Sequence, residues 1–314
     1  MRTWLALGVL VLACGVALAP PGATAAELAF ARSGTLHEAL FSVSLAGTRG
    51  IAAGAAGEIM ESTDAGANWE QVAPTPTLMA LLGSAVDGDQ ALVVGQMGTI
   101  LRRSDDGRWQ DSASNSEERL LAVDLDGSLA VAAGAFGTVL GSRDGGRSWA
   151  SIRPDWDELN DGTEPHIYAV RIWGGDRITI AGEFGLILRS DDGGASWTRQ
   201  HLGERSIFAL DLHDDGRGLA VGQNGKALAT VDGGESWEPL ALDTEANLFG
   251  VVFHDQVIHV TGMYEVMSSS NGGRSWTRPN QEYGIGWLSG LAMIPGTATA
   301  IGVGSTGAIV RLEP

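Results

Sequence analysis

Short apolar segments recur along the chain between turns rich in glycine and aspartate. They are about four residues long, contain many β-branched or aromatic residues and lack a helical period, so they predict β-strands. Seven of them open equivalent units: LFSV from Leu40, LMAL from Leu78, LLAV from Leu120, IYAV from Ile167, IFAL from Ile207, LFGV from Leu248 and WLSG from Trp287.

A glycine turn followed by a second apolar segment comes later in each unit. The copies are GAAGEIM from Gly54, GQMGTIL from Gly95, GAFGTVL from Gly134, GEFGLIL from Gly182, GQNGKAL from Gly222, the degenerate GMYEVM from Gly262 and GSTGAIV from Gly304. Glycine supplies positive φ values at little cost, so this pattern predicts a tight turn between two strands.

Six units then end in a tryptophan turn of the Asp-box type. The copies are STDAGANW from Ser62, SDDGRW from Ser104, SRDGGRSW from Ser142, SDDGGASW from Ser190, TVDGGESW from Thr230 and SSNGGRSW from Ser269. Successive tryptophans lie 40, 40, 48, 40 and 39 residues apart. The seventh unit has no such turn before Pro314.

A unit of about forty residues with four short antiparallel strands is one blade of a β-propeller. Seven units predict an all-β, seven-bladed β-propeller formed as a single domain by residues 27–314. Because the seventh unit ends after three strands, we expect ELAFAR, from Glu27 to Arg32, to supply its outer strand and close the ring.

The Asp-box turns are assigned a structural role. The aspartate accepts hydrogen bonds inside its own turn, the serine or threonine before tryptophan adds a side-chain to backbone bond, and tryptophan packs beneath the hairpin. The turns lack the alternating oxygen ligands of a calcium loop. The residues concerned are Asp64, Trp69, Asp106, Trp109, Asp144, Trp149, Asp192, Trp197, Asp232, Trp237, Asn271 and Trp276.

Charge narrows the range of partners. The 38 acidic and 20 basic residues give a formal net charge of -18, which excludes a nucleic-acid binder and does not suit anionic lipid surfaces. We therefore expect the partner to be a protein rather than a nucleic acid. We also expect the chain to be a monomer.

Residues 1–26 have the pattern of a signal peptide: Arg2, an apolar stretch from Trp4 to Leu18, and small residues before Glu27. The apolar stretch is too short for a comfortable membrane span. Cleavage predicts a periplasmic or secreted protein without cysteine. Lipid attachment at Cys14, the one cysteine of the chain, is the alternative.

The candidate partner-binding residues are those that break the repeat. The two residues inside each glycine turn should face the mouth of the central channel, as should the links between blades. Bulky or charged side chains stand there at Met97, Phe136, Glu183, Phe184, Met263 and Tyr264. Exposed methionine and aromatic side chains suit a protein partner, although they would also suit packing over neighbouring loops.

One link is longer than the others. The interval of 48 residues between Trp149 and Trp197 includes RPDWDELNDGTEPH, from Arg153 to His166. Insertions on repeat scaffolds often carry specificity, which makes Trp156, Asp157 and Glu158 candidates for partner binding. A cation site and a solvated filler loop remain the alternatives.

Catalytic and metal-binding patterns are lacking. The sequence has no G-x-S-x-G elbow, no phosphate loop and no histidine spacing typical of zinc. We therefore expect no catalytic residue, no metal and no cofactor.

Two families resemble this repeat. Asp boxes are shared with sialidases, but the arginine-isoleucine-proline motif and the tyrosine–glutamate pair of that family are not found; the nearest match is RIW from Arg171. The photosystem II stability/assembly factor family is similar over roughly residues 30–313, and GEFGLILRSDDGGASW, from Gly182 to Trp197, is the cleanest copy of its pattern.

The second resemblance implies a non-enzymatic assembly factor that docks on a membrane-protein complex. We expect a periplasmic scaffold for an inner-membrane complex, either photosystem-like or an exporter. A sialidase-like glycoside hydrolase and a carbohydrate-binding module are the alternatives.

Overall fold

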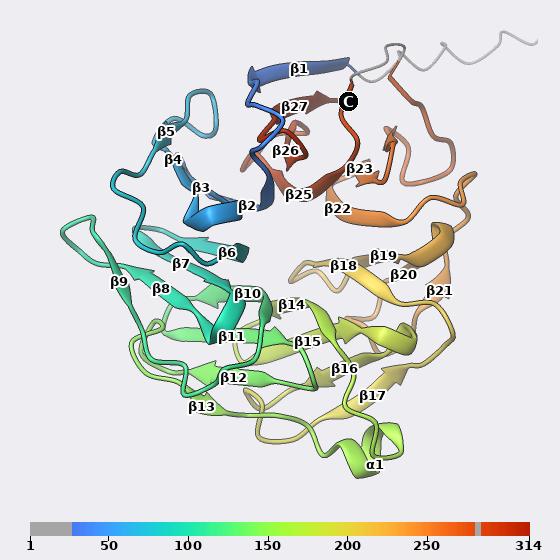
Figure 1. Ribbon diagram of the computed structural model, residues 1–314. Helices are drawn as coiled ribbons and strands as arrows, with labels where there is room; N and C mark the ends of the chain where they lie inside the picture. Colours follow the sequence, from blue (N-terminus) through green and yellow to red (C-terminus); the bar gives the residue numbers. More distant parts are fainter. Residues whose placement is uncertain (1–26, 280–283) are drawn as a thin grey trace, which may run out of the picture.

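The computed structural model describes residues 27–279 and 284–314 and shows a ring of seven small antiparallel sheets (Figure 1). The predicted seven-bladed propeller is confirmed. The predicted signal peptide and Cys14 lie outside the described residues. Within the part of the chain that is described, no helix has both the length and the apolar character needed to cross a membrane.

Each blade begins with an innermost strand beside the central channel. These strands are β2 (Leu40–Ala46), β6 (Leu81–Asp87), β10 (Leu120–Asp126), β14 (Ile167–Trp173), β18 (Ile207–Leu212), β22 (Leu248–His254) and β25 (Leu288–Met293). The first residues of two inner strands differ from the prediction. The strand expected from Leu78 begins at Leu81, and the one expected from Trp287 begins at Leu288, because the residues before them belong to the links.

The second and third strands of each blade flank the glycine turn. The second strands are β3 (Arg49–Gly54), β7 (Gln90–Gly95), β11 (Leu129–Gly134), β15 (Arg177–Gly182), β19 (Gly218–Gly222), β23 (Val257–Gly262) and β26 (Ala300–Gly304). The third strands are β4 (Ile59–Ser62), β8 (Ile100–Arg103), β12 (Val139–Ser142), β16 (Ile187–Ser190), β20 (Ala227–Thr230), β24 (Glu265–Ser269) and β27 (Ile309–Glu313).

Outer strands complete the blades. Five follow the Asp-box turns: β5 (Glu70–Gln71), β9 (Trp109–Asp111), β13 (Ala150–Ser151), β17 (Thr198–His201) and β21 (Glu238–Pro239). Blade six has three strands among the described residues. Blade seven takes its outer strand from the other end of the chain.

The N-terminal strand closes the ring as predicted. Strand β1 (Glu27–Arg32) pairs antiparallel with β27, with Leu28 opposite Leu312 and Phe30 opposite Val310. The Arg32 guanidinium donates to the Gly307 carbonyl at 2.6 Å and contacts the Glu58 carboxylate of blade one at 3.2 Å. One segment therefore ties blade seven to blade one.

The core lies between neighbouring blades, because each sheet buries both faces against its neighbours. At the closing interface, Val43 and Met60 of blade one pack with Ile301 and Val303 of blade seven. Every residue of β3 after Arg49 is buried, as expected of a strand covered on both faces. Blade geometry, and with it the position of every loop, depends on these contacts.

The Asp-box turns form hydrogen bonds within the hairpin, as Asp192 of blade four illustrates. Its carboxylate accepts from the Ser196 N–H at 2.8 Å, the Ser196 hydroxyl at 2.6 Å and the Ser190 hydroxyl at 2.8 Å. One detail of the prediction is wrong. The serine before tryptophan donates to the aspartate, whereas Ser190 accepts the backbone N–H of Gly194 at 2.8 Å.

The tryptophans of these turns also contact the neighbouring blade. Trp197 Nε1 donates to the Ile152 carbonyl of blade three at 2.9 Å, and Trp149 packs into the core between blades two and three. The Asp box therefore folds its own hairpin and helps to orient adjacent blades.

Deleting β1 should destabilise the propeller, since it removes a strand ladder and the Arg32 contacts that join the ends of the ring. A loss of about 2–3 kcal/mol would lower the Tm by roughly 3–5 °C in a domain of this size. The measurement is thermal unfolding of residues 33–314 against residues 27–314. Equal Tm values would contradict closure by this strand.

Acid unfolding should respond to the charge of the Asp boxes. Hydrogen bonds from Ser196 and Ser190 lower the pKa of Asp192 from 3.8 to about 2. The carboxylate therefore contributes stability that is present above about pH 4 and lost as the pH falls toward 2. Asn271 makes equivalent bonds in blade six, accepting the Ser275 N–H at 3.0 Å, so Asp192→Asn should still fold.

Thermal unfolding at several pH values tests this dependence. Between pH 4 and pH 2 the Tm should fall less in Asp192→Asn than in the parent, and more in the reciprocal Asn271→Asp. Three parallel profiles would show that the ionised carboxylate does not stabilise the turn.

Candidate functional site

The glycine turns and the links between blades lie on the same face of the ring. In blade four the N–H of Glu183 donates to the His166 carbonyl at 3.0 Å, across the start of β14. A Cβ on Gly182 would lie 2.2 Å from that carbonyl oxygen, so only glycine allows this approach. All seven blades repeat the bond; the donors are Ala55, Gln96, Ala135, Glu183, Gln223, Met263 and Ser305. The predicted placement of the turns beside the links is therefore correct.

The second residue of each turn adopts a left-handed conformation and points outward. Its φ lies between 51° and 62° in all seven blades, at Ala56, Met97, Phe136, Phe184, Asn224, Tyr264 and Thr306. The apolar side chains among them are exposed, by 65% at Met97, 57% at Phe136, 44% at Phe184 and 82% at Tyr264; Met263 beside Tyr264 is 38% exposed. These candidates do not fold into the core.

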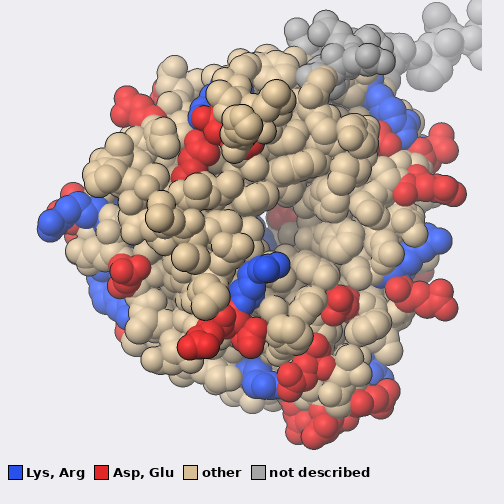
Figure 2. All heavy atoms as spheres, in the orientation of Figure 1, with Lys and Arg blue, Asp and Glu red and all other residues tan. Residues whose placement is uncertain are grey.

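A ring of apolar side chains surrounds the channel mouth inside these turns. It comes from the second position of each inner strand: Phe41, Leu82, Leu121, Tyr168, Phe208 and Phe249, with Ser289 in blade seven. All seven are half-buried and line a hollow of about 470 Å³. Figure 2 shows this opening at the centre of the ring, rimmed mostly by uncharged side chains.

Sequence reasoning missed this inner ring. The signal was present in the openings LFSV, IYAV, IFAL and LFGV, in which an aromatic residue follows the first aliphatic one. We interpreted these residues only as strand formers. In the blade, the first residue is buried in the core and the second points into the channel.

Aromatic contacts join the inner ring to the exposed turns. Phe136 packs edge-on against His166 with centroids 5.0 Å apart, and the Phe136 N–H donates to His166 Nδ1 at 3.1 Å. His166 neighbours Tyr168 at 6.4 Å, and Tyr168 packs edge-on against Phe208 at 5.3 Å. The turns, the long link and the inner ring therefore form one surface, which we call the link face.

The long link contains a helix, α1 (Trp156–Asn160), which lies at the rim of the ring (Figure 1). Its Trp156 was predicted to bind a partner, and the structure contradicts this. Trp156 is buried against Leu186 and Val139, and its Nε1 donates to the Gly137 carbonyl at 3.2 Å. The tryptophan anchors the link to the neighbouring blades.

The acidic residues of the long link are mostly solvated. Asp155 caps α1 by accepting the N–H groups of Asp157 and Glu158, and Glu164 pairs with Arg153. Asp157 and Glu158 remain exposed, as their candidate role requires, and acidic side chains gather over α1 (Figure 2). In the described part of the chain, no three histidine, cysteine, aspartate or glutamate side chains are grouped as a metal site would require.

Glu183 is half-buried and has a positioning role. Its carboxylate accepts the His166 N–H at 2.9 Å, which holds the long link against the glycine turn. Burial and the nearby Glu183 raise the pKa of the Tyr168 phenol, so Tyr168 presents a neutral ring to the channel. Glu183 therefore supports the link face rather than offering a free charge.

The opposite end of the channel is polar. Arg171 lies 3.4 Å from Asp124 and 3.8 Å from Asp211, and His213 lies 3.2 Å from Asp211. The two carboxylates also accept backbone N–H groups of neighbouring blades, from Ile172 at 2.7 Å and Phe253 at 3.1 Å. Burial raises the pKa of Asp124. These groups join adjacent inner strands.

Comparisons with known proteins agree with the predicted resemblance. Residues 203–311, in blades five to seven, match the family model described as photosynthesis system II assembly factor YCF48. A search of curated protein sequences finds no match.

Solved structures share the fold. YCF48 bound to a D1 peptide has a TM-score of 0.71 at 15% identity, over 94% of this chain and 97% of that one. YCF48 from Cyanidioschyzon merolae has a TM-score of 0.73 at 19% identity, over 93% and 99%.

A glycoside hydrolase has a similar propeller. The GH74 xyloglucanase from Xanthomonas campestris has a TM-score of 0.71 at 16% identity, over 90% of this chain and 53% of that one. At such identities the structures establish the propeller fold alone. The family model adds to this, and it confirms over residues 203–311 the predicted resemblance of this chain to the photosystem II assembly factor family.

Proposed function

We propose that this chain is a non-enzymatic scaffold or assembly factor, exported to the periplasm, which binds an inner-membrane protein complex through its link face. The observation that carries the proposal is the apolar surface formed by the inner ring and the exposed turn residues. An exposed apolar surface of this kind on a soluble domain is typical of a protein-binding site.

The backbone of the turns supports a binding role. A left-handed conformation costs a bulky L-residue roughly 1–2 kcal/mol, and asparagine tolerates it better. Blade five has Asn224 at this position, yet Met97, Phe136, Phe184 and Tyr264 occupy it elsewhere. The backbone conformation and the solvent exposure of these apolar side chains both cost free energy in the isolated protein. Backbone strain of this kind concentrates at functional sites.

The comparisons with solved structures support the class of partner that we propose, a protein. A YCF48 structure of similar fold contains a bound D1 peptide, which supports a peptide-binding role for this propeller as well. For this chain a photosystem-like complex and an exporter both fit an assembly role. The predicted signal peptide at residues 1–26 supports a periplasmic location, with lipid attachment at Cys14 as the alternative.

A glycoside hydrolase is the second candidate. Two carboxylates, Asp124 and Asp211, lie near Arg171 at the polar end of the channel, and the xyloglucanase has a similar fold. Glycoside hydrolysis uses a pair of free carboxylates. Here both accept backbone N–H groups that join neighbouring blades, which favours a structural role. Release of reducing sugar from xyloglucan that is lost in Asp211→Asn would contradict the non-enzymatic proposal; we expect no release.

Removing apolar side chains from the link face should abolish partner binding. The triple variant Phe136→Asn, Phe184→Asn and Tyr264→Asn keeps a residue that adopts the left-handed conformation, as Asn224 does. We expect it to recover at least tenfold less of the membrane complex from detergent-solubilised membranes of the source cell. Loss of a few exposed aromatic anchors commonly has effects of this size.

Val231→Ser provides the matched control. Val231 is an exposed apolar residue of the Asp-box turn in blade five, on the opposite face of the ring. This variant should recover the complex as the parent does. Equal recovery by all three proteins, or loss with Val231→Ser alone, would contradict binding through the link face.

A further inference from the structure

In four blades, the same backbone hydrogen bond joins the outer strand to the third strand. The residue three positions after the Asp-box tryptophan donates its N–H to the carbonyl of the first apolar residue of the third strand. The pairs are Val72 to Ile59 at 2.9 Å, Ser112 to Ile100 at 2.9 Å, Ile152 to Val139 at 3.0 Å and Leu240 to Ala227 at 3.0 Å. The side chains of Val72, Ile152 and Leu240 also pack against the cores between blades.

Blade six has a proline at this position. Pro279 has no N–H and cannot donate to Val266, the residue that corresponds to Ile59. Among the described residues, the only outer pairing of β24 is the bridge between Ser268 and Thr277, with bonds of 2.9 and 2.8 Å. Alternation along an antiparallel strand directs the Val266 carbonyl toward the outer edge. That carbonyl therefore lacks the donor that blades one, two, three and five supply.

The burial of Val266 also distinguishes blade six from the other blades. Val266 is half-buried, whereas its six counterparts are buried: Ile59, Ile100, Val139, Ile187, Ala227 and Ile309. Among the residues that the structure describes, the edge of β24 is thus uncovered at a place where every other blade is covered.

The glycine turn of blade six departs from the repeat as well. In blade one the link passes directly over the second glycine, so that a Cβ on Gly57 would lie 1.8 Å from the Thr77 carbonyl oxygen. Blade six lacks a second glycine between Gly262 and Glu265. Its link crosses instead at Tyr264, whose N–H donates to the Gly286 carbonyl at 2.9 Å.

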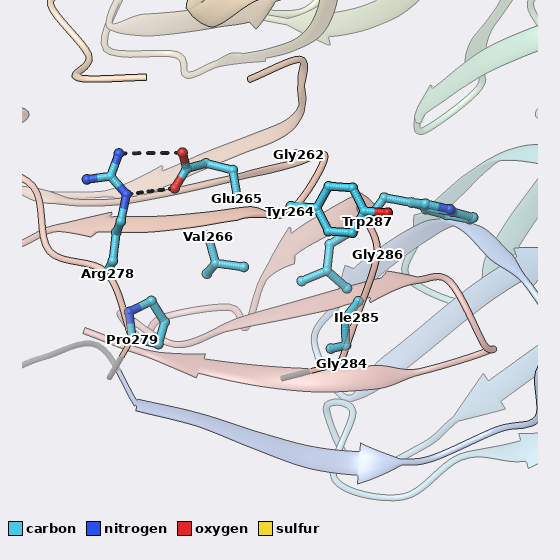
Figure 3. Close-up of a pocket in the computed structure, with 11 residues that line it drawn as sticks. Gly262, Tyr264, Glu265, Val266, Arg278, Pro279, Gly284, Ile285, Gly286 and Trp287 are labelled. Carbon is cyan, nitrogen blue, oxygen red and sulfur yellow. Dashed lines mark hydrogen bonds and ion pairs between the residues drawn. The ribbon is translucent and has the colours of Figure 1, made fainter. Parts of the chain in front are cut away.

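These departures leave a cavity of about 650 Å³ beside the edge of β24 (Figure 3). Val266, Ile285, Tyr264 and Trp287 form its apolar part. Arg278 and Glu265, whose Nε and Oε1 atoms are 2.8 Å apart, lie at its other end. The cavity therefore offers an aliphatic site, an ion pair at one end, and a backbone carbonyl to which no described residue donates.

We propose that this edge binds an extended segment of a partner protein, which adds the outer strand that blade six lacks. The segment donates a backbone N–H to the Val266 carbonyl and places an aliphatic side chain where blades one, three and five place Val72, Ile152 and Leu240. Addition of a strand to an open sheet edge is an established mode of peptide recognition. The edge site adjoins the link face, since Tyr264 belongs to both and Trp287 stacks on Phe41 with centroids 5.7 Å apart. It uses the edge of β24 and does not depend on the proposed function.

A peptide copied from the chain itself tests the edge site. The probe is acetylated and amidated Ala-Ser-Ile-Arg, the sequence of residues 150–153, titrated into the protein with ¹³C-carbonyl-labelled valine. We expect saturable shifts centred on Val266, with a Kd on the order of 1 mM for so short a ligand. The same peptide with aspartate in place of isoleucine should not bind.

Pro279→Val is the matched variant, because it gives the chain its own N–H donor and aliphatic side chain at this edge. It should weaken peptide binding at least tenfold, and Pro279→Ala, which restores only the N–H, should have a smaller effect. Phe184→Asn should leave peptide binding unchanged, which separates this test from that of the link face.

Three results would overturn the proposal. One is the absence of shifts at Val266 up to several millimolar peptide. Another is binding of equal strength by Pro279→Val in a correctly folded variant. The third is shifts centred on any other valine.

Discussion

One hydrogen bond, repeated in every blade, determines the geometry of the link face. The carbonyl just before each inner strand accepts the N–H that follows the first glycine of the turn, at 2.9–3.0 Å in all seven blades. It requires glycine, because any Cβ there would overlap the carbonyl oxygen. The bond fixes each link against its turn. It thereby holds the second residue of the turn, in its left-handed conformation, at the surface of the ring.

Other parts of the repeat serve the ring itself. The Asp boxes lie on the opposite face, where Asp192 and its equivalents satisfy the backbone of their hairpins. Their tryptophans reach the preceding blade, and β1 joins the two ends of the ring. The Asp-box residues recur in six of the seven units, whereas the exposed turn residues of the link face differ from unit to unit.

Much of this architecture could be predicted from the sequence, because it depends on local chemistry that recurs. The glycine turns and Asp boxes gave the number of blades, and the shortened last unit indicated that ELAFAR closes the ring. The starts of two inner strands were misplaced, since Leu78 and Trp287 are apolar but belong to links.

The candidate site was predicted only in part. Exposure of Met97, Phe136, Phe184 and Tyr264 follows from their place in a turn. Burial of Trp156 does not, because it depends on a contact with Gly137 in a distant turn. The inner ring was also not predicted. Alternation along a strand separates its two faces, but it does not show which apolar residues line a channel and which are buried between blades.

The central claim is that the link face binds a protein. A photo-crosslinking amino acid placed at Phe184, with the same residue at Val231 as reference, tests it most directly in living cells. The account predicts a discrete protein adduct at Phe184 and none at Val231. Adducts at Val231 alone, or at neither position while the membrane complex still co-purifies, would contradict it.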